Sequence, residues 1–554
     1  MTREIIFYGQ DHSPIDEAFY EEVSIDSQYR VTSKNRNIKS FAEDDKNLET
    51  LINALIDLDS KLNNKLKKKK QEDTENDSLL VVGHTHEKDD DFANQEYHIY
   101  DASIGEHGFF GSLVGTVRTK VGKQNVKIVI RSRFDDFDPV HPDETKPYFL
   151  ASLLLSGELE FSSAAVDFSY DSLFHFYMIW VLKKHFQDAL LKGLFKKYQR
   201  FERNDDRVRG AIDVSRHIRL NLGMNNGKIA YSYRENSYDN PINHLILTAY
   251  HYLSDNYPDL TEKGFDYDLV KTIKSLEYET GYPKYDVRSV ISANIDPVSH
   301  PYYFEYEQLR KDCLMILRDE GLSPFDNTDE SVYGVLYYVP DLWESYLMQF
   351  FKSGLYRYYK EASEDEADDE PKLMIRIEDQ KKVKVMNVPD DREGAKGKNT
   401  YPDFWFTYSM GEDGKQIPFA ILDAKYKTGW EDALDGDLPS DLLGDYDKCL
   451  RDMVSAGGTS AGVVFPCRAV KTDPVHVHRC SGYNDFQCFY TFPVNVPSSG
   501  EYDDFYDWES DMNEATIDLM EQIVEKFLVR DAERKKALLN LRLNAFKELG
   551  ELEV

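Results

Sequence analysis

Cysteine is scarce and scattered in this chain, which has five in 554 residues. A disulfide framework needs more cysteines at closer spacing, so a disulfide-stapled fold is excluded. Long apolar runs are also missing, because the longest candidate, Phe149 to Leu155, is far shorter than the roughly 18 residues that cross a bilayer. The first residues lack the charged-then-apolar layout of a signal peptide. We therefore expect a cytoplasmic protein with no membrane segment.

Positive charge is in the minority, since 67 Lys and Arg stand against 100 Asp and Glu, a net charge of −33. DNA affinity comes mostly from basic side chains that neutralise phosphates, so we expect weak DNA binding by this chain alone. The stretch from Lys192 to Arg219 reverses the trend with nine basic residues against four acids. It is either a phosphate-facing or partner-facing surface, with Arg207 and Arg209 as candidate DNA contacts, or an ordinary exposed helix and turn.

Length and an apolar content of 41% predict a multidomain α/β protein. We predict five units along the chain. They are an atypical N-terminal extension (1–95), a β-rich domain (96–160), a mainly helical domain with the basic stretch (161–330), an α/β domain (331–500) and a C-terminal helical segment (501–554).

Periodicity predicts individual elements within these units. Apolar alternation indicates strands over 113–117 and 126–130, and a helix begins at Tyr148. Helical spacing over 48–66 runs into the tetralysine Lys67–Lys70, which we interpret as a solvated helix end rather than a nucleic-acid contact.

The most informative segment has a Pro-Asp pair ending at Asp403 and, twenty residues later, Asp423-Ala424-Lys425. Both lie in apolar stretches typical of strands, joined by a Gly-Glu-Asp-Gly turn. Side chains alternate faces along a strand, so Asp423 and Lys425 point the same way. If Asp403 lies on the neighbouring strand, two carboxylates and one lysine converge.

Metal-assisted phosphodiester hydrolysis requires such a set. Two carboxylates and the carbonyl of Ala424 would ligate Mg²⁺, or Mn²⁺ in its place, and the lysine would act on the attacking water and the phosphate charge. The alternative is a surface hairpin in which Asp423 and Lys425 form a weak ion pair. Apolar neighbours such as Trp405 and Ile421 argue against it, because charge in a buried sheet is costly. We predict Asp403, Asp423 and Lys425 as the catalytic residues.

Three further residues are candidates for the same site. Glu344 lies at the edge of the apolar stripe of a helix that opens near Asp341, and it would add a metal ligand. Asp341 and Glu344 also have the spacing of a capping box, which is the competing interpretation. Lys448, on a helix predicted over 441–453, and Lys427 are candidate phosphate or DNA contacts, or solvated side chains.

A zinc site is a weaker hypothesis. His476, His478 and Cys480 alternate along one predicted strand, and Cys488 follows eight residues later. These ligand types suit zinc, but the spacing matches no common zinc pattern, so we favour surface histidines and reduced cysteines.

With these residues in place, the chain resembles McrC, the nuclease subunit of McrBC-type modification-dependent restriction systems, over about residues 110–495. Two segments of the central region look like the family's signatures, Arg207–Asp213 and Tyr233–Asn243. In the C-terminal half, Leu342–Glu344 looks like the beginning of the family's nuclease domain. Pro402-Asp403 and Asp423-Ala424-Lys425 match the catalytic motif of that domain. The first 95 residues and the acidic run 361–370 depart from the family, as does Lys448 where the family often has Gln.

The resemblance implies a C-terminal restriction-endonuclease-like α/β domain of the PD-(D/E)xK type. It also implies a hetero-oligomer in which an AAA+ motor of the McrB type, a GTPase or ATPase, recognises and moves DNA. The subunit docks on the motor through its N-terminal region, stimulates nucleotide hydrolysis and cuts the DNA, in an anti-phage role. Two other hypotheses stay open, namely a non-catalytic adaptor that stimulates the motor and a nuclease directed at RNA or single strands.

Overall fold

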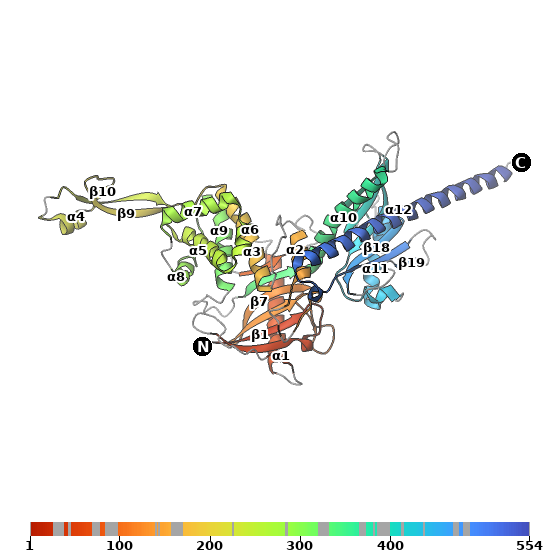
Figure 1. Ribbon diagram of the computed structural model, residues 1–554, viewed down its shortest axis with the longest axis horizontal. Helices are drawn as coiled ribbons and strands as arrows, with labels where there is room; N and C mark the ends of the chain where they lie inside the picture. Colours follow the sequence, from red (N-terminus) through yellow and green to blue (C-terminus); the bar gives the residue numbers. More distant parts are fainter. Residues whose placement is uncertain are drawn as a thin grey trace, which may run out of the picture.

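The computed structural model consists of an N-terminal sheet, a cluster of helices that carries a long arm, and a second sheet flanked by helices (Figure 1). Among the residues described, no helix combines the length and apolarity needed to cross a membrane. The structure describes residues 2–25, 38–41, 46–68, 78–82, 98–138, 141, 145–156, 170–223, 226–282, 286–319, 332–364, 373–379, 383–384, 399–410, 415–435, 438–468, 476–479 and 488–552.

The N-terminal sheet has seven strands drawn from distant parts of the chain. Strand β1 pairs in parallel with β8, which pairs antiparallel with β7, and β7 pairs antiparallel with β12. Leucines of α1, among them Leu51 and Leu55, pack on one face against Phe7 and Ile128. Across the sheet the strands are β3 (Lys39–Ser40), β2 (Phe19–Ile25), β1 (Thr2–Gln10), β8 (Gln124–Arg131), β7 (Leu113–Val121), β12 (Tyr333–Tyr338) and β4 (Ser78–Val82), with α1 (Lys46–Lys68) beside them.

This sheet corrects two of the predicted domain boundaries. The boundary at 95 fails because β1 and β2 are integral strands, so residues 1–95 are not a separate extension. The boundary at 330 fails because β12 completes the N-terminal sheet instead of opening the α/β domain. Pairing between strands some 200 residues apart leaves no local sequence pattern. The strands predicted over 113–117 and 126–130 and the helix over 48–66 are confirmed, while the side chains of Lys67–Lys70 lie outside the described residues.

A cluster of helices follows and continues the apolar core of the C-terminal half. The helices from Tyr148 onward are α2 (Tyr148–Ser156), α3 (Tyr170–Leu190), α5 (Pro241–Asn256), α6 (Pro258–Gly264), α7 (Tyr267–Thr280), α8 (Val287–Ala293) and α9 (Glu305–Asp319). The arm leaves this cluster between α3 and α5 and extends away from it (Figure 1).

The arm is a two-stranded ribbon with a small tip. Strand β9 (Lys197–Asp205) pairs along its whole length with β11 (Ile229–Ser237), while β10 (Ala211–Ile212) and α4 (Val214–Asn221) form the tip. The interpretation of Lys192 to Arg219 as an exposed helix and turn is therefore wrong over 197–205 and 211–212, which are strands, whereas 214–219 are helical. Because both faces of β9 are largely exposed, no apolar alternation marks it as a strand.

The second sheet has six strands, in the order β13-β16-β17-β18-β20-β19, with parallel pairing on both sides of β18. Helices α10 and α12 pack on one face and α11 on the other, which is the α/β layering expected of this region. The elements are α10 (Val339–Glu364), β13 (Leu373–Asp379), β16 (Phe404–Met410), β17 (Ile417–Ala424), α11 (Leu443–Ala456), β18 (Ser460–Cys467), β19 (His476–Arg479), β20 (Cys488–Asn495) and α12 (Phe505–Leu552), with the small pair β14 (Val383–Lys384) and β15 (Asn399–Thr400) beside α11.

Candidate active site

Asp403 and Asp423 lie side by side on neighbouring strands of the second sheet. The antiparallel register pairs Phe404 of β16 with Leu422 of β17, which places the preceding Asp403 opposite the following Asp423. The Asp403 carboxylate accepts the backbone N–H of Ala424 at 2.7 Å, so it is tied to the end of β17. The predicted convergence of the two aspartates with Lys425 is therefore observed.

Two lysines reach the carboxylates from different elements. The Lys425 ammonium lies 2.5 Å from Asp423 and 3.7 Å from Asp445. From α11, the Lys448 ammonium lies 3.0 Å from Asp423 and 3.9 Å from Asp403. Asp423 is 1% exposed and Asp403 is 8% exposed. The weak surface ion pair considered as an alternative is thus excluded by burial. Lys448 pairs with the aspartates in this arrangement, while its side chain stays 32% exposed.

Burial and neighbouring charges move the two aspartates in opposite directions. Burial opposes ionisation of Asp423, but the charges of Lys425 and Lys448 outweigh it and lower the pKa of this carboxyl below its usual range. For Asp403, burial together with the negative charges of Asp423 and Glu344 raises the pKa well above the usual value. The pKa values of these two neighbouring carboxyls are thus shifted in opposite directions, a separation typical of functional carboxylate pairs.

The first two turns of α10 add two acids to this cluster. Glu344 is half-buried and acts on Asp403 electrostatically. Burial and the charge of Asp403 raise the pKa of Asp341 to about 7. Because α10 begins at Val339, Asp341 lies inside the helix and cannot be its N-cap, so the capping-box interpretation is wrong. Asp341 is a site residue that the sequence analysis missed, and the only available signal was its position next to Glu344.

The donor set suits a hard divalent cation. Asp341, Glu344, Asp403 and Asp423 contribute four carboxyl groups against the two ammonium groups of Lys425 and Lys448, an excess of two negative charges when all are ionised. Carboxylate oxygens are the ligands that Mg²⁺ prefers. As they stand, however, the described residues include no group of three or more His, Cys, Asp or Glu gathered as metal ligands. The carboxylate ligands suit a divalent cation, and the ammonium groups of Lys425 and Lys448 balance their charge in this structure.

The remaining basic candidates lie elsewhere. Lys427 is half-exposed, donates to the carbonyl of Asp441 at 3.0 Å and lies 3.9 Å from Asp445, at the beginning of α11. Arg207 and Arg209 are exposed in the tip of the arm, at the opposite end of the molecule from β17 and α11 (Figure 1). The structure therefore brings Lys427 near the end of β17 but places neither arginine there.

The two central signature segments build the arm. At the tip, the carboxylate of Asp213 accepts the backbone N–H of Arg216 and caps α4. At the root, the Asn243 side chain donates to the carbonyls of Phe195 and Tyr238, at 3.0 and 2.7 Å.

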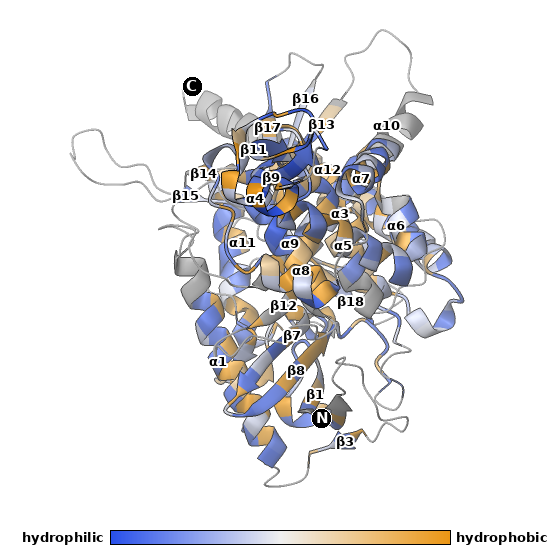
Figure 2. Ribbon diagram, turned by 90° about the vertical axis from the view of Figure 1, so that its left-hand side faces the viewer, coloured by the Kyte–Doolittle hydropathy of each residue, from blue (hydrophilic) through white to orange (hydrophobic). Residues whose placement is uncertain are grey.

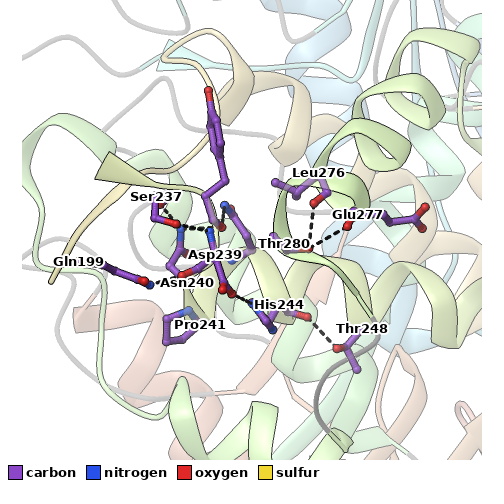
Figure 3. Close-up of polar contacts among 12 residues, drawn as sticks. Gln199, Ser237, Asp239, Asn240, Pro241, His244, Thr248, Leu276, Glu277 and Thr280 are labelled. Atoms are coloured by element: carbon purple, nitrogen blue, oxygen red, sulfur yellow. Dashed lines mark hydrogen bonds and ion pairs between the residues drawn. The ribbon is translucent and has the colours of Figure 1, made fainter. Parts of the chain in front are cut away.

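The root has further polar contacts (Figure 3). The Asn240 side chain donates to the carbonyls of Ser237 and Tyr238 and accepts the N–H of Asn243. His244 Nε2 lies 2.7 Å from Asp239. Residues 237 to 244 thus fasten the strands of the arm to α5.

The arm also exposes apolar side chains that a buried core would normally hold. Figure 2 shows apolar residues on α4 at the tip of the arm. The exposed ones include Val208, Ile212, Val214, Ile218 and Leu222, at 41–78% exposure. A cluster of this kind on a projecting element marks a surface for another macromolecule.

The zinc hypothesis finds no structural test. Strand β19 contains His476 and His478, whose side chains lie outside the described residues together with Cys480, while Cys488 is buried in β20.

Comparisons with known proteins include one family match and two structural alignments. The family described as "McrBC 5-methylcytosine restriction system component" matches residues 110–437. No curated protein matches the chain. One solved structure, Thermococcus gammatolerans McrB AAA+ hexamers with bound McrC, aligns at 12% identity over 92% of this chain and 99% of that one, with a TM-score of 0.40. The cryo-EM structure of the T. gammatolerans McrBC complex aligns at 14% identity over 63% and 88%, with a TM-score of 0.25. Both TM-scores are too low to establish a common fold.

Proposed function

The chain belongs to the family of McrBC 5-methylcytosine restriction system components, and from this premise we propose that it is a metal-dependent DNA endonuclease subunit of a restriction complex. The observation that carries the proposal is the buried convergence of Asp403, Asp423 and Lys425 at the end of two paired strands. Buried charges at this density are costly to stability, and the opposite pKa shifts of the two aspartates are typical of functional sites.

Asp403, Asp423, Glu344 and the carbonyl of Ala424 would hold Mg²⁺, with Mn²⁺ as a substitute. The bound ion supplies a positive charge that polarises the phosphate and lowers the pKa of a water molecule. Asp403 would have to be ionised to hold the ion, because a metal ligand must be ionised. Lys425, freed from Asp423, orients the attacking water and offsets the charge that develops on the phosphate. Lys448 remains next to Asp423 and keeps that carboxylate ionised and oriented.

The partner would be an AAA+ motor of the McrB type, as the resemblance to McrC implies. The arm, rather than the N-terminal region that the resemblance implies, offers the docking surface in this proposal, since its exposed apolar and basic side chains lie far from the second sheet (Figure 1). Docking and cleavage are then separate tasks of one chain. A motor that binds the DNA would also compensate for the acidic charge of this subunit, because steering by its own field would be unfavourable.

The test compares cleavage of plasmid and linear DNA by wild type, Asp423→Asn and Asp312→Asn, with Mg²⁺ or Mn²⁺ and with or without the motor protein and its nucleotide. Asp312 is the matched control, because it is a buried aspartate that pairs with His185 in the helical cluster. We expect Asp423→Asn to lose cleavage by at least about 10²-fold, while Asp312→Asn cuts as wild type does.

The outcomes separate the competing functions. If Asp423→Asn still stimulates nucleotide hydrolysis by the motor but no longer cuts, the nuclease and docking roles are both supported. If wild type stimulates the motor and never cuts, the chain is an adaptor. Cleavage of RNA or single-stranded DNA in preference to duplex DNA would support the third hypothesis. Equal cutting by wild type and Asp423→Asn would show that this site is not catalytic.

A further inference from the structure

The loop that follows β8 of the N-terminal sheet touches the end of the catalytic strand. Strand β8 ends at Arg131, and the next residues, Ser132 and Arg133, lie against Tyr426, which directly follows Lys425. Contacts between these two segments bridge about 290 residues of sequence. They are separate from the carboxylate cluster itself, so nothing in the hydrolytic chemistry requires them.

Arg133 makes the central contact from the side of the N-terminal sheet. Its guanidinium donates a hydrogen bond to the backbone carbonyl of Tyr426 and lies 4.3 Å from the centroid of the Tyr426 ring. Asp11, which is 1% exposed, orients the arginine by accepting its backbone N–H at 2.6 Å and lying 3.5 Å from its guanidinium. The guanidinium is therefore held in one geometry by a buried acid and by an aromatic face.

Tyr426 is equally constrained on its own side. Its ring is buried at 2% exposure and lies against Phe134, Phe149 and His12, with centroid distances of 5.9 to 6.3 Å. Its hydroxyl is 3.3 Å from the hydroxyl of Ser132. The side chain is thus fixed between the N-terminal sheet and α2, and it cannot move without disturbing both.

Lys425 lies between two backbone anchors as a result. Its own N–H donates to the carbonyl of Val464 in β18 at 2.9 Å, so one side belongs to the second sheet. The next carbonyl, that of Tyr426, accepts from Arg133, so the other side belongs to the N-terminal sheet. The direction in which the Lys425 side chain leaves the backbone depends on both bonds.

We infer that Arg133 is a positioning residue for Lys425. Through Arg133, the position of the N-terminal sheet relative to β17 determines the geometry of the cleavage site. A movement of the sheet that withdraws the guanidinium releases the Tyr426 carbonyl and lets the end of β17 shift. A displacement of the lysine by about 1 Å is enough to slow a reaction by about 10²-fold. The part of the inference that concerns cleavage rests on the proposed nuclease function, whereas the part that concerns the backbone does not.

The experiment compares Arg133→Gln and Arg133→Lys with Arg468→Gln. Arg468 crosses the same interface, donating to the carbonyl of Phe134 and to Asp136, but it does not touch the strand that bears Lys425. Hydrogen exchange of the backbone amides over residues 423–429, followed by mass spectrometry, reports the backbone directly. Turnover of duplex DNA under the conditions in which wild type cuts reports the consequence.

We expect exchange over 423–429 to accelerate about 10-fold in Arg133→Gln, with kcat lowered about 10- to 100-fold and KM for DNA unchanged. Arg133→Lys keeps the charge near Asp11 but loses the planar fork, so its effects should be intermediate. Arg468→Gln should match wild type over 423–429 and in kcat. Unchanged exchange in Arg133→Gln, or equal acceleration in Arg468→Gln, overturns the inference. A wild type that cuts nothing refutes the nuclease function instead, and the exchange result still decides the positioning role.

Discussion

Replacing Asp403 by asparagine should abolish the stabilisation that Mg²⁺ gives the protein without destabilising the metal-free protein. Burial and the charges of Asp423 and Glu344 raise the pKa of the Asp403 carboxyl, so its ionised form is unfavourable in the absence of a cation. Asparagine keeps the oxygen that accepts the Ala424 N–H at 2.7 Å but carries no charge. We therefore expect the free energy of unfolding of the metal-free variant to equal that of wild type or exceed it by about 1 kcal/mol.

The magnitude of the magnesium effect follows from mass action. At a free Mg²⁺ concentration about 100 times the dissociation constant, binding adds about 2.7 kcal/mol to the free energy of unfolding of wild type. For a domain of about 150–250 residues, each kcal/mol moves the melting temperature by about 2–4 °C, so the expected shift is about 5–10 °C. Asp403→Asn should show almost none of it.

The assay is a thermal melt of each protein across a magnesium titration, with Asp312→Asn as the control that keeps the full shift. The pH dependence has a fixed sign. Because the pKa of Asp403 is raised and the ion displaces its proton, the magnesium shift of wild type should grow as pH rises. If Mg²⁺ stabilises Asp403→Asn as much as wild type, the ion binds elsewhere and the assignment of the site is wrong.

Three more perturbations test other parts of the molecule. Burial lowers the pKa of His12 from 6.5 to about 4. The unfolded chain therefore binds this proton more readily than the folded protein, and the free energy of unfolding falls as pH drops below about 6.5. In urea unfolding, wild type should lose about 2 kcal/mol more than His12→Asn between about pH 7 and pH 5. Asn243→Ala removes two hydrogen bonds at the root of the arm and should lower the free energy of unfolding by about 2 kcal/mol, without changing DNA cleavage by the subunit alone. Ile218→Asp, at an exposed position of α4, should weaken binding to the motor at least about 10-fold in a titration, while a thermal melt shows no loss of stability.

The convergence of Asp403, Asp423 and Lys425 could be predicted because its information is local. Asp403 and Asp423-Ala424-Lys425 lie in apolar strands whose alternation fixes the direction of the side chains, and the antiparallel register then brings them together. The helices predicted over 48–66 and 441–453 were equally accessible, since their apolar spacing is strong. The α/β character of this region follows from the same patterns, whereas the number and order of the strands in its sheet do not.

The elements that were missed depend on contacts that no window of sequence contains. The sequence of β1 does not indicate which strand it pairs with, because its partner β8 lies more than 100 residues later in the chain. The ribbon of the arm has no buried face, so its strands β9 and β11 carry no periodic signal. Asp341 was interpreted as a helix cap because the beginning of α10 was placed two residues too late. Lys448 was assigned to phosphate or solvent because its distance to Asp423 depends on how α11 packs against β17.

The late arrival of β12 in the N-terminal sheet has a consequence for biosynthesis. Strands β7 and β8 leave the ribosome about 200 residues before β12 does, a delay of about 10–40 s at a synthesis rate of about 5–20 residues per second. During this interval β7 presents an open edge, and β4, whose one partner among the described strands is β12, has nothing to pair with. The helical cluster and its arm are made in the same interval, so they can fold before the sheet on which they are mounted is closed. A nascent chain arrested before residue 333 would therefore expose a strand edge that pairs readily with other chains, and this step of synthesis is where we expect a demand for chaperones.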